Sequence, residues 1–180
     1  MTAARRAAPA LLAAVLLAAV LLGAGCAQVV RVKATGPVGQ GGEGAGARYL
    51  VDKLSFEIPE SWTPSGDARR LTAVQPDGLG RLDVQRAERT FSGEAECLSQ
   101  ARAALEKGTS QATDVRLHPT TFAGRKGIAT EGDQGGWHGW AWGICDGPVQ
   151  YRVSFWGATP LREDVLAAWT GLSASARFEP

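Results

Sequence analysis

The sequence predicts an α+β fold in which a single, mostly antiparallel sheet of about six strands has a helix packed on each face. Three observations lead to this prediction: segments in which polar and apolar residues alternate, turn residues between consecutive segments, and two segments with apolar residues at helical spacing. The composition indicates one globular domain, because 44% of the 180 residues are hydrophobic and 21% are charged.

The longest predicted element is an antiparallel hairpin over residues 136–157, with Asp146-Gly147 as its turn signal. Because Pro148 has no N–H, we expect a four-residue loop from Cys145 to Pro148. The expected cross-strand pairs are Ile144 with Val149, Trp142 with Tyr151, Trp140 with Val153 and His138 with Phe155. These residues form a bulky apolar face, whereas Gly139, Ala141, Gly143 and Cys145 make the other face small along the first strand.

The remaining elements follow from the same signals, taken in chain order. They are a strand over 54–58, a hairpin over 71–86 with its turn at 76–80, a helix over 94–107, a strand over 115–117 broken at His118-Pro119, a strand over 121–131 bent at Gly124 and Gly127, a final helix and an edge segment over 174–178. In the first helix the apolar stripe is Cys97, Leu98, Ala101, Ala104 and Leu105. The last helix should begin with Thr159 as N-cap and Pro160 at its first position, and bury Val165, Leu166, Trp169 and Leu172.

Residues 1–25 have the order of a secretory signal: Arg5 and Arg6, an apolar run over 10–22, and small residues before Cys26. The segment resembles a bacterial lipoprotein signal, whose cysteine is diacylated and becomes the new N-terminus. It departs from the lipobox in having Gly23 where the family prefers Leu. A plain secreted protein and an uncleaved anchor are the alternatives.

Residues 26–47 are expected to form a lipidated cysteine followed by a flexible tether. Six glycines fall in the eleven positions 36–46. Such a segment cannot bury enough apolar surface to fold. A Gly-rich coil over 27–47 would reach roughly 25 Å, enough to hold a domain above a membrane. Gly39, Gly41 and Gly44 match a nucleotide-binding spacing, but no strand precedes them and no helix follows, so the match is coincidental.

The charge balance argues against nucleic acid as a partner. The net charge is +1, and without Arg5 and Arg6 the remaining 17 basic residues face 18 acidic ones. A protein that neutralises many phosphates normally carries a basic surplus.

The folded part, residues 48–180, resembles a superfamily that includes the photosystem-associated PsbP proteins, the Ran-binding Mog proteins and bacterial DcrB-type and Lpq-type lipoproteins. The residues that carry this resemblance are LSFEIPESW over 54–62, the helix before the Gly124 strand, and YRVSFWG over 151–157 followed by a helix. The resemblance covers residues 49–178. It implies an accessory or binding protein and supplies no catalytic residues.

Three cysteines are present, and a lipidated Cys26 leaves Cys97 and Cys145. In an exported, oxidising compartment these two are expected to form a disulfide that joins the first helix to the small face of the hairpin. Two buried free thiols are the alternative. A metal site is not expected, because His118 and His138 do not give zinc spacing with either cysteine.

Enzymatic activity is not expected. No Gly-x-Ser-x-Gly motif is present, no pair of carboxylates stands out, and His138 lies on the apolar face of the hairpin. No cofactor is predicted. A hydrolase that carries no recognisable motif is the remaining enzymatic possibility.

Six tryptophans are the feature most suggestive of binding. Trp140, Trp142 and Trp169 lie on stripes that face the core, whereas Trp137, Trp156 and Trp62 are candidates for an exposed ligand-binding patch. The sequence therefore predicts an exported lipoprotein, anchored at the outer face of the cytoplasmic membrane or in the outer membrane, that acts as a non-enzymatic binding or assembly module. An envelope protein or a cell-wall glycan is the expected partner, with glycan or small-solute binding through exposed tryptophans as the alternative function.

Overall fold

A computed structural model describes residues 46–180, so the predicted signal, Cys26 and most of the tether lie outside the described residues. The described part contains ten strands and two helices. They are β1 (Ala47–Val51), β2 (Leu54–Ile58), β3 (Thr63–Gly66), β4 (Arg70–Val74), β5 (Gly80–Thr90), α1 (Glu94–Gly108), β6 (Thr113–Phe122), β7 (Arg125–Gln134), β8 (Trp137–Asp146), β9 (Val149–Ala158), α2 (Glu163–Ser175) and β10 (Arg177–Phe178). Neither helix is long and apolar enough to span a membrane.

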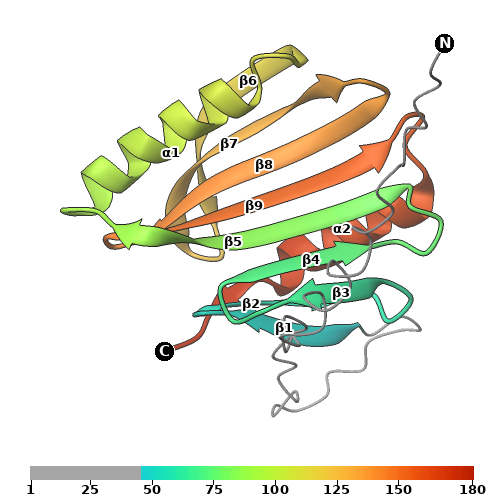
Figure 1. Cartoon of the computed structure of the whole chain (residues 1–180), viewed down its shortest axis with the longest axis horizontal. Helices are drawn as coiled ribbons and strands as arrows, with labels where there is room; N and C mark the ends of the chain where they lie inside the picture. The colour runs from blue at the N-terminus through green and yellow to red at the C-terminus, as the bar shows by residue number, and fades with distance from the viewer. Residues whose placement is uncertain (1–45) are drawn as a thin grey trace, which may run out of the picture.

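The predicted single sheet of about six strands with a helix on each face is wrong, because the chain is mostly β and forms two sheets. A large sheet has the order β3-β4-β5-β9-β8-β7-β6, and a small sheet has the order β1-β2-β10. In Figure 1 the small sheet lies below β3 and β4, and α2 is seen between β5 and the small sheet. The short strands β1, β3 and β10 offer little sequence to establish a period, which explains why the prediction merged the two sheets.

The hairpin β8–β9 keeps the two predicted faces but not the predicted register. Asp146 pairs with Val149 and Trp142 with Val153, so each pair is shifted by two residues and the turn is only Gly147-Pro148. In a two-residue turn the closing N–H belongs to the residue after the turn, so the missing N–H of Pro148 is no obstacle. A shift of two residues leaves every side chain on its original face.

The segment over 113–134 forms a second long hairpin that the sequence did not reveal. β6 runs unbroken through Pro119, because β6 is the edge strand of the large sheet and needs no ladder hydrogen bond on its outer side. Ala123 and Gly124 form the turn with φ of 50° and 77°. Alanine rarely adopts a positive φ, so Ala123-Gly124 is a weak sequence signal for this turn.

Helix α1 packs on the small-residue face of the large sheet, as predicted. A Cβ built on Gly143 would lie 2.6 Å from the Cβ of Ala101, so only glycine permits this approach. A disulfide joins Cys97 in α1 to Cys145 in β8, with 6.1 Å between their Cα atoms, which confirms the predicted pairing. In the chain-entropy model a loop of this length contributes about 4 kcal/mol. Of the predicted stripe, Ala104 is exposed.

Helix α2 packs on the aromatic face of the large sheet. The ring of Trp169 stacks on Trp142 with centroids 4.3 Å apart, and on Trp140 at 5.6 Å. The helix begins at Glu163 with Arg162 as N-cap, so the predicted start at Thr159 and Pro160 is wrong. Leu166, predicted to be buried, is 39% exposed, and Ala168 takes its place in the core.

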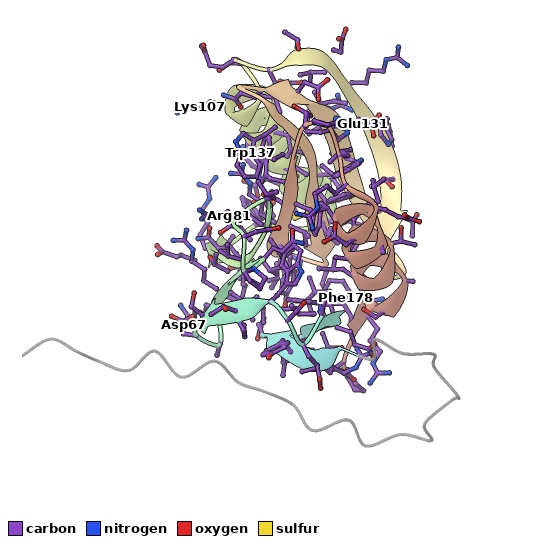
Figure 2. The ribbon with its side chains drawn as sticks, turned by 90° about the vertical axis from the view of Figure 1, so that its right-hand side faces the viewer. Asp67, Arg81, Lys107, Glu131, Trp137 and Phe178 are labelled. Carbon is purple, nitrogen blue, oxygen red and sulfur yellow. A yellow bond between two sulfur atoms is a disulfide. The ribbon has the colours of Figure 1, made fainter. Side chains whose placement is uncertain are left out.

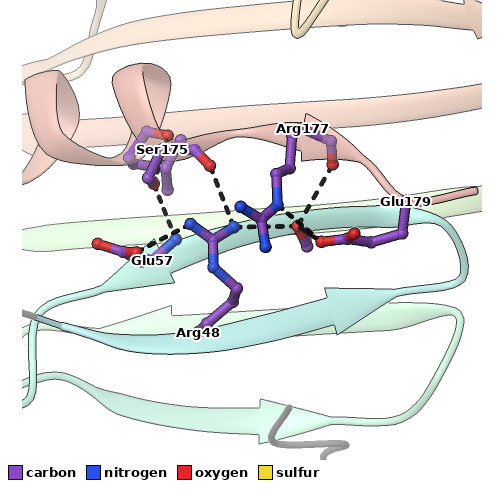
Figure 3. Close-up of polar contacts among 7 residues, drawn as sticks. Arg48, Glu57, Ser175, Arg177 and Glu179 are labelled. Atoms are coloured by element: carbon purple, nitrogen blue, oxygen red, sulfur yellow. Dashed lines mark hydrogen bonds and ion pairs between the residues drawn. The ribbon is translucent and has the colours of Figure 1, made fainter. Parts of the chain in front are cut away.

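The small sheet is tied to the end of α2 by a polar network around Arg48 (Figure 3). The guanidinium of Arg48 donates to Glu57 at 2.8 Å, to Ser55 at 3.0 Å and to the carbonyl of Ser175 at 3.2 Å. The Ser55 hydroxyl, almost fully buried, donates to Glu179 at 2.6 Å. Each buried polar group of this network therefore has a partner, as burial requires.

A second polar link joins the small sheet to the large one. The Tyr151 hydroxyl donates to Asp52 in the β1–β2 turn at 2.6 Å, and Arg86 donates to the same carboxylate at 2.8 Å. Burial, together with this hydrogen bond, raises the pKa of Tyr151 well above its usual value. The phenol therefore stays protonated and remains a donor.

We predict that Trp169→Ala lowers the free energy of unfolding by about 3 kcal/mol, because it removes the ring that fills the space between α2 and the large sheet. Urea denaturation at 25 °C measures this loss. Leu166→Ala on the same helix is the control and should cost about 1 kcal/mol or less, since its side chain is partly exposed. Equal losses for the two variants would contradict the central role of the Trp169 stack.

Candidate functional site

The large sheet has one face that is only partly covered. Helix α1 lies mainly over β7 and β8, and beyond it β4, β5 and β9 present polar side chains on the same side. We call this surface the open face; it consists of Arg70, Thr72, Arg81, Asp83, Gln85, Arg152, Ser154 and Trp156. Strand alternation creates it, because Leu71, Ala73, Leu82, Val84, Val153 and Phe155 between these residues point into the core.

Strand register arranges the open face in three rows across the sheet. The first row is Arg70, Gln85 and Arg152, the second is Thr72, Asp83 and Ser154, and the third is Arg81 beside Trp156. Neighbouring strands lie about 4.8 Å apart, so Arg70 and Arg152 start roughly 10 Å from each other. The rows place hydrogen-bonding groups at regular intervals.

Asp83 is at the centre of the open face, and its charge is neutralised there. Arg81 donates to its two oxygens at 2.7 and 3.0 Å, and Thr72 donates at 2.7 Å. Burial opposes ionisation, but the hydrogen bonds from Arg81 and Thr72 outweigh it and hold the pKa of Asp83 below its usual value. Asp83 is therefore ionised and fully engaged at neutral pH.

The other two arginines of the open face give it a positive charge. Neither Arg70 nor Arg152 forms an ion pair within residues 46–180. Both are exposed, and the guanidinium of Arg152 lies near Gly108, where the negative end of the α1 dipole favours a cation. With Arg81 paired to Asp83, the guanidinium groups of Arg70 and Arg152 remain without an ion pair among the described residues.

A groove of about 210 Å³ runs along the open face and ends at Trp156. The indole lies over Gly139, where a built Cβ would come within 2.3 to 2.7 Å of ring carbons, so a side chain at 139 would displace the ring. Trp156 is half-buried and lines the groove. In Figure 2 Arg81, Trp137 and Lys107 of α1 lie on the same side of the molecule.

The structure separates the three predicted candidate tryptophans. Trp156 lines the groove, and Trp137 lies on the same face at the start of β8. Trp62 is only 6% exposed and stacks on Phe155 at 5.7 Å, on the opposite, aromatic side. The three residues therefore do not form one patch, and Trp62 is a core residue.

Trp62 also lines a second hollow of about 340 Å³ between the loop after β2 and α2. Ala167 and Gly171 of α2 line this hollow, and their small size keeps it open. Gln75 lines it too and donates to Asp164 at 2.7 Å, while its buried amide oxygen has no partner among the described residues. The carboxylate of Asp164 is shared with Arg162, so this hollow offers few uncommitted polar groups.

The arginines and Asp83 of the open face were missed as site residues. The only sequence signal was that the outward positions of the predicted hairpin over 71–86 are polar, which is also true of ordinary solvent-facing strands. Their neighbours Arg152 and Trp156 come from β9, about 70 residues later, and only the β5–β9 pairing brings the two sets together.

The two histidines lie away from the open face. His118 is exposed on the edge strand β6. His138 contacts Asp133 at 2.8 Å and packs edge-on against Trp140. Residues 46–180 contain no group of three or more side chains that could hold a metal ion.

Comparisons with known proteins identify the fold alone. No protein-family model matches the chain, and no curated protein matches it in sequence. The solution structure of a cyanobacterial PsbP (CyanoP) from Synechocystis is similar, with a TM-score of 0.53 and 15% identity over 80% of this chain and 100% of that one. The described part of the chain therefore has a PsbP-like fold, as the sequence resemblance implied.

A crystal structure of a protein from Bacteroides thetaiotaomicron is also similar, with a TM-score of 0.52 and 12% identity over 77% of this chain. The match covers 49% of the Bacteroides chain, so this chain spans about half of its length.

We predict that Asp83→Asn lowers the free energy of unfolding at pH 7 by about 1 kcal/mol, because it removes a charge that accepts three hydrogen bonds. The folded-state pKa of Asp83 is depressed, so its contribution is present at neutral pH and is lost as the pH falls through that pKa. The difference from wild type should therefore shrink below about pH 4. Chemical denaturation from pH 7 to pH 3 measures it. Glu131→Gln, which removes an exposed carboxylate on β7, should show no such dependence.

Proposed function

We propose that the chain is an exported, membrane-tethered lipoprotein that acts as a non-enzymatic binding or assembly module of the cell envelope, with the open face as its binding surface. The observation that carries this proposal is the half-covered sheet face, where two arginines without ion pairs and a partly exposed tryptophan surround a groove. Surfaces that combine aromatic and arginine side chains are typical of binding sites.

The chemistry of the open face supports binding rather than catalysis. Its groups are guanidinium, amide and hydroxyl groups, which recognise ligands by hydrogen bonds. Ser154 pairs with Asp83 in register, but Asp83 is already engaged by Arg81 and Thr72. A serine needs an available base to act as a nucleophile, and no histidine lines the groove.

The order of segments supports the tether. An apolar run, Cys26 and a glycine-rich stretch precede the first strand, which begins at Ala47. A lipidated Cys26 would leave about twenty residues to span the distance from membrane to domain, roughly 25 Å for a Gly-rich coil. Anchoring at the outer face of the cytoplasmic membrane and anchoring in the outer membrane are both compatible with this order.

A glycan ligand is the second candidate function, and Trp156 favours it over a small enclosed solute. An indole beside hydrogen-bonding groups can stack on a sugar ring. The groove of about 210 Å³ is smaller than the ~300–1,000 Å³ clefts that enclose drug-sized ligands. A ligand would therefore lie across the open face instead of being enclosed.

We predict that the wild-type chain incorporates radiolabelled palmitate in bacterial cells and that Cys26→Ser does not, because the thiol is the point of attachment. Gel autoradiography measures the label. A Cys97→Ser, Cys145→Ser double variant is the control and should be labelled as the wild type is. Equal labelling of wild type and Cys26→Ser, or none in either, would contradict the lipoprotein proposal.

We also predict that a photo-crosslinking amino acid at Gln85, in the middle of the open face, yields crosslinked species from intact cells. The same residue at Glu131, exposed on the distant strand β7, is the control and should yield few. Electrophoretic shifts of the tagged chain measure both. If position 85 gives no more crosslinking than position 131, the open face is not the binding surface.

A further inference from the structure

The open face already holds one carboxylate, which shows the geometry that its arginines can offer. The guanidinium of Arg81 donates a hydrogen bond to each oxygen of Asp83, at 2.7 and 3.0 Å. A guanidinium presents parallel N–H donors that match the two oxygens of a carboxylate. Arg70 and Arg152 carry the same donors and form no ion pair within residues 46–180, so each can receive a carboxylate from outside.

The spacing of these two arginines favours separate carboxylates over one phosphate. Arg70 and Arg152 stand two strands apart, roughly 10 Å at the backbone, with Gln85 between them. A phosphate is usually held by donors that converge on one point, often backbone N–H groups at a helix N-terminus. Here the helix end beside Arg152 is the C-terminal end of α1, which supplies no free backbone N–H donors for a phosphate. Carboxylates repeated along an extended polymer fit the spacing better.

The groups between the arginines suit hydroxyl-rich ligands. Gln85 adds an exposed amide between the two arginines, while the Thr72 hydroxyl already donates to Asp83 and Ser154 is only 6% exposed. Trp156, at the end of the groove, adds an aromatic surface on which a sugar ring can stack. An acidic peptide offers no sugar ring for Trp156 to stack on, so a polymer that carries both rings and carboxylates uses more of the groove.

We infer that the open face binds an acidic polysaccharide, in which Arg70 and Arg152 each hold the carboxylate of a sugar acid and Trp156 stacks on a sugar ring. This inference rests on the proposed function, since it names the ligand class of the same surface. The groove of about 210 Å³ takes one part of the polymer, and the rest lies across β4, β5 and β9. Arg81 and Asp83 stay paired and keep the centre of the face neutral.

Isothermal titration calorimetry with the full-length chain in detergent tests the inference, with trigalacturonic acid as the probe. Arg70→Gln and Arg152→Gln should each weaken binding roughly tenfold, because each removes a charge-assisted bidentate contact. Arg152→Lys keeps the charge but loses the paired donors, so it should weaken binding by a smaller factor.

Trp156→Leu should weaken binding through loss of stacking. Arg116→Gln on the edge strand β6 is the matched control and should leave binding unchanged.

Two other probes decide the ligand class. Maltotriose, which is neutral, and a triglutamate peptide, which is acidic but has no sugar ring, should both bind more weakly than trigalacturonic acid. Equal binding of maltotriose would overturn the role of the arginines, and equal binding of triglutamate with no effect of Trp156→Leu would indicate an acidic peptide instead. An effect of Arg116→Gln as large as that of Arg152→Gln would show only nonspecific charge attraction.

The failure of this inference can be told from the failure of the proposed function. If trigalacturonic acid does not bind but a crosslinker at Gln85 still captures envelope components, the open face is a binding surface for another ligand. If neither is observed, the proposed function falls as well. Melting temperatures of the arginine variants by circular dichroism should stay within about 2 °C of the wild type, since these side chains are exposed.

Discussion

The stacking of Trp169 on Trp142 is the interaction on which the arrangement of the two sheets depends. Trp169 also contacts Trp140 and Phe155, so one side chain of α2 covers the aromatic face of both central strands, β8 and β9. The strand that follows α2, β10, then pairs with β2. A helix held by stacked rings on the large sheet thus brings the small sheet to it, and the two sheets share one hydrophobic core.

The packing on the opposite face depends on a different constraint, namely the small side chains of β8. Gly143 allows Ala101 to reach the backbone of β8, and the Cys97–Cys145 disulfide holds the helix there. Because α1 is held mainly over β7 and β8, it meets β9 only at its edge and leaves β4 and β5 uncovered. The open face is the consequence, and the polar residues on it, centred on Asp83, are those that an uncovered sheet face requires.

Most of the features that were predicted correctly depend on local sequence patterns, and most of those that were missed depend on pairing between distant segments. The bulky face and the small face of residues 136–157 could be predicted because they depend only on the alternation of side chains. A register shift of two residues leaves each side chain on the same face. The division into two sheets could not, because it depends on the pairing of β10 with β2, about 120 residues apart. The turn at Ala123-Gly124 was missed for a local reason, since alanine in a left-handed conformation has no sequence signature. Trp62 was assigned to an exposed patch because alternation says nothing of which loop residues fold back onto the core.

The separation of the two faces also bears on how a tethered domain could bind a ligand. The chain enters the described part at Ala47 in the small sheet, whose core side packs against the aromatic face of the large sheet. The open face lies on the other side of the large sheet, with α1. The tether proposed above would therefore be attached on the side of the large sheet away from Arg152 and Trp156. A polymer lying across β4, β5 and β9 would then not compete with the membrane for the same surface, and the tether would need only length, not a particular conformation, to leave the groove accessible.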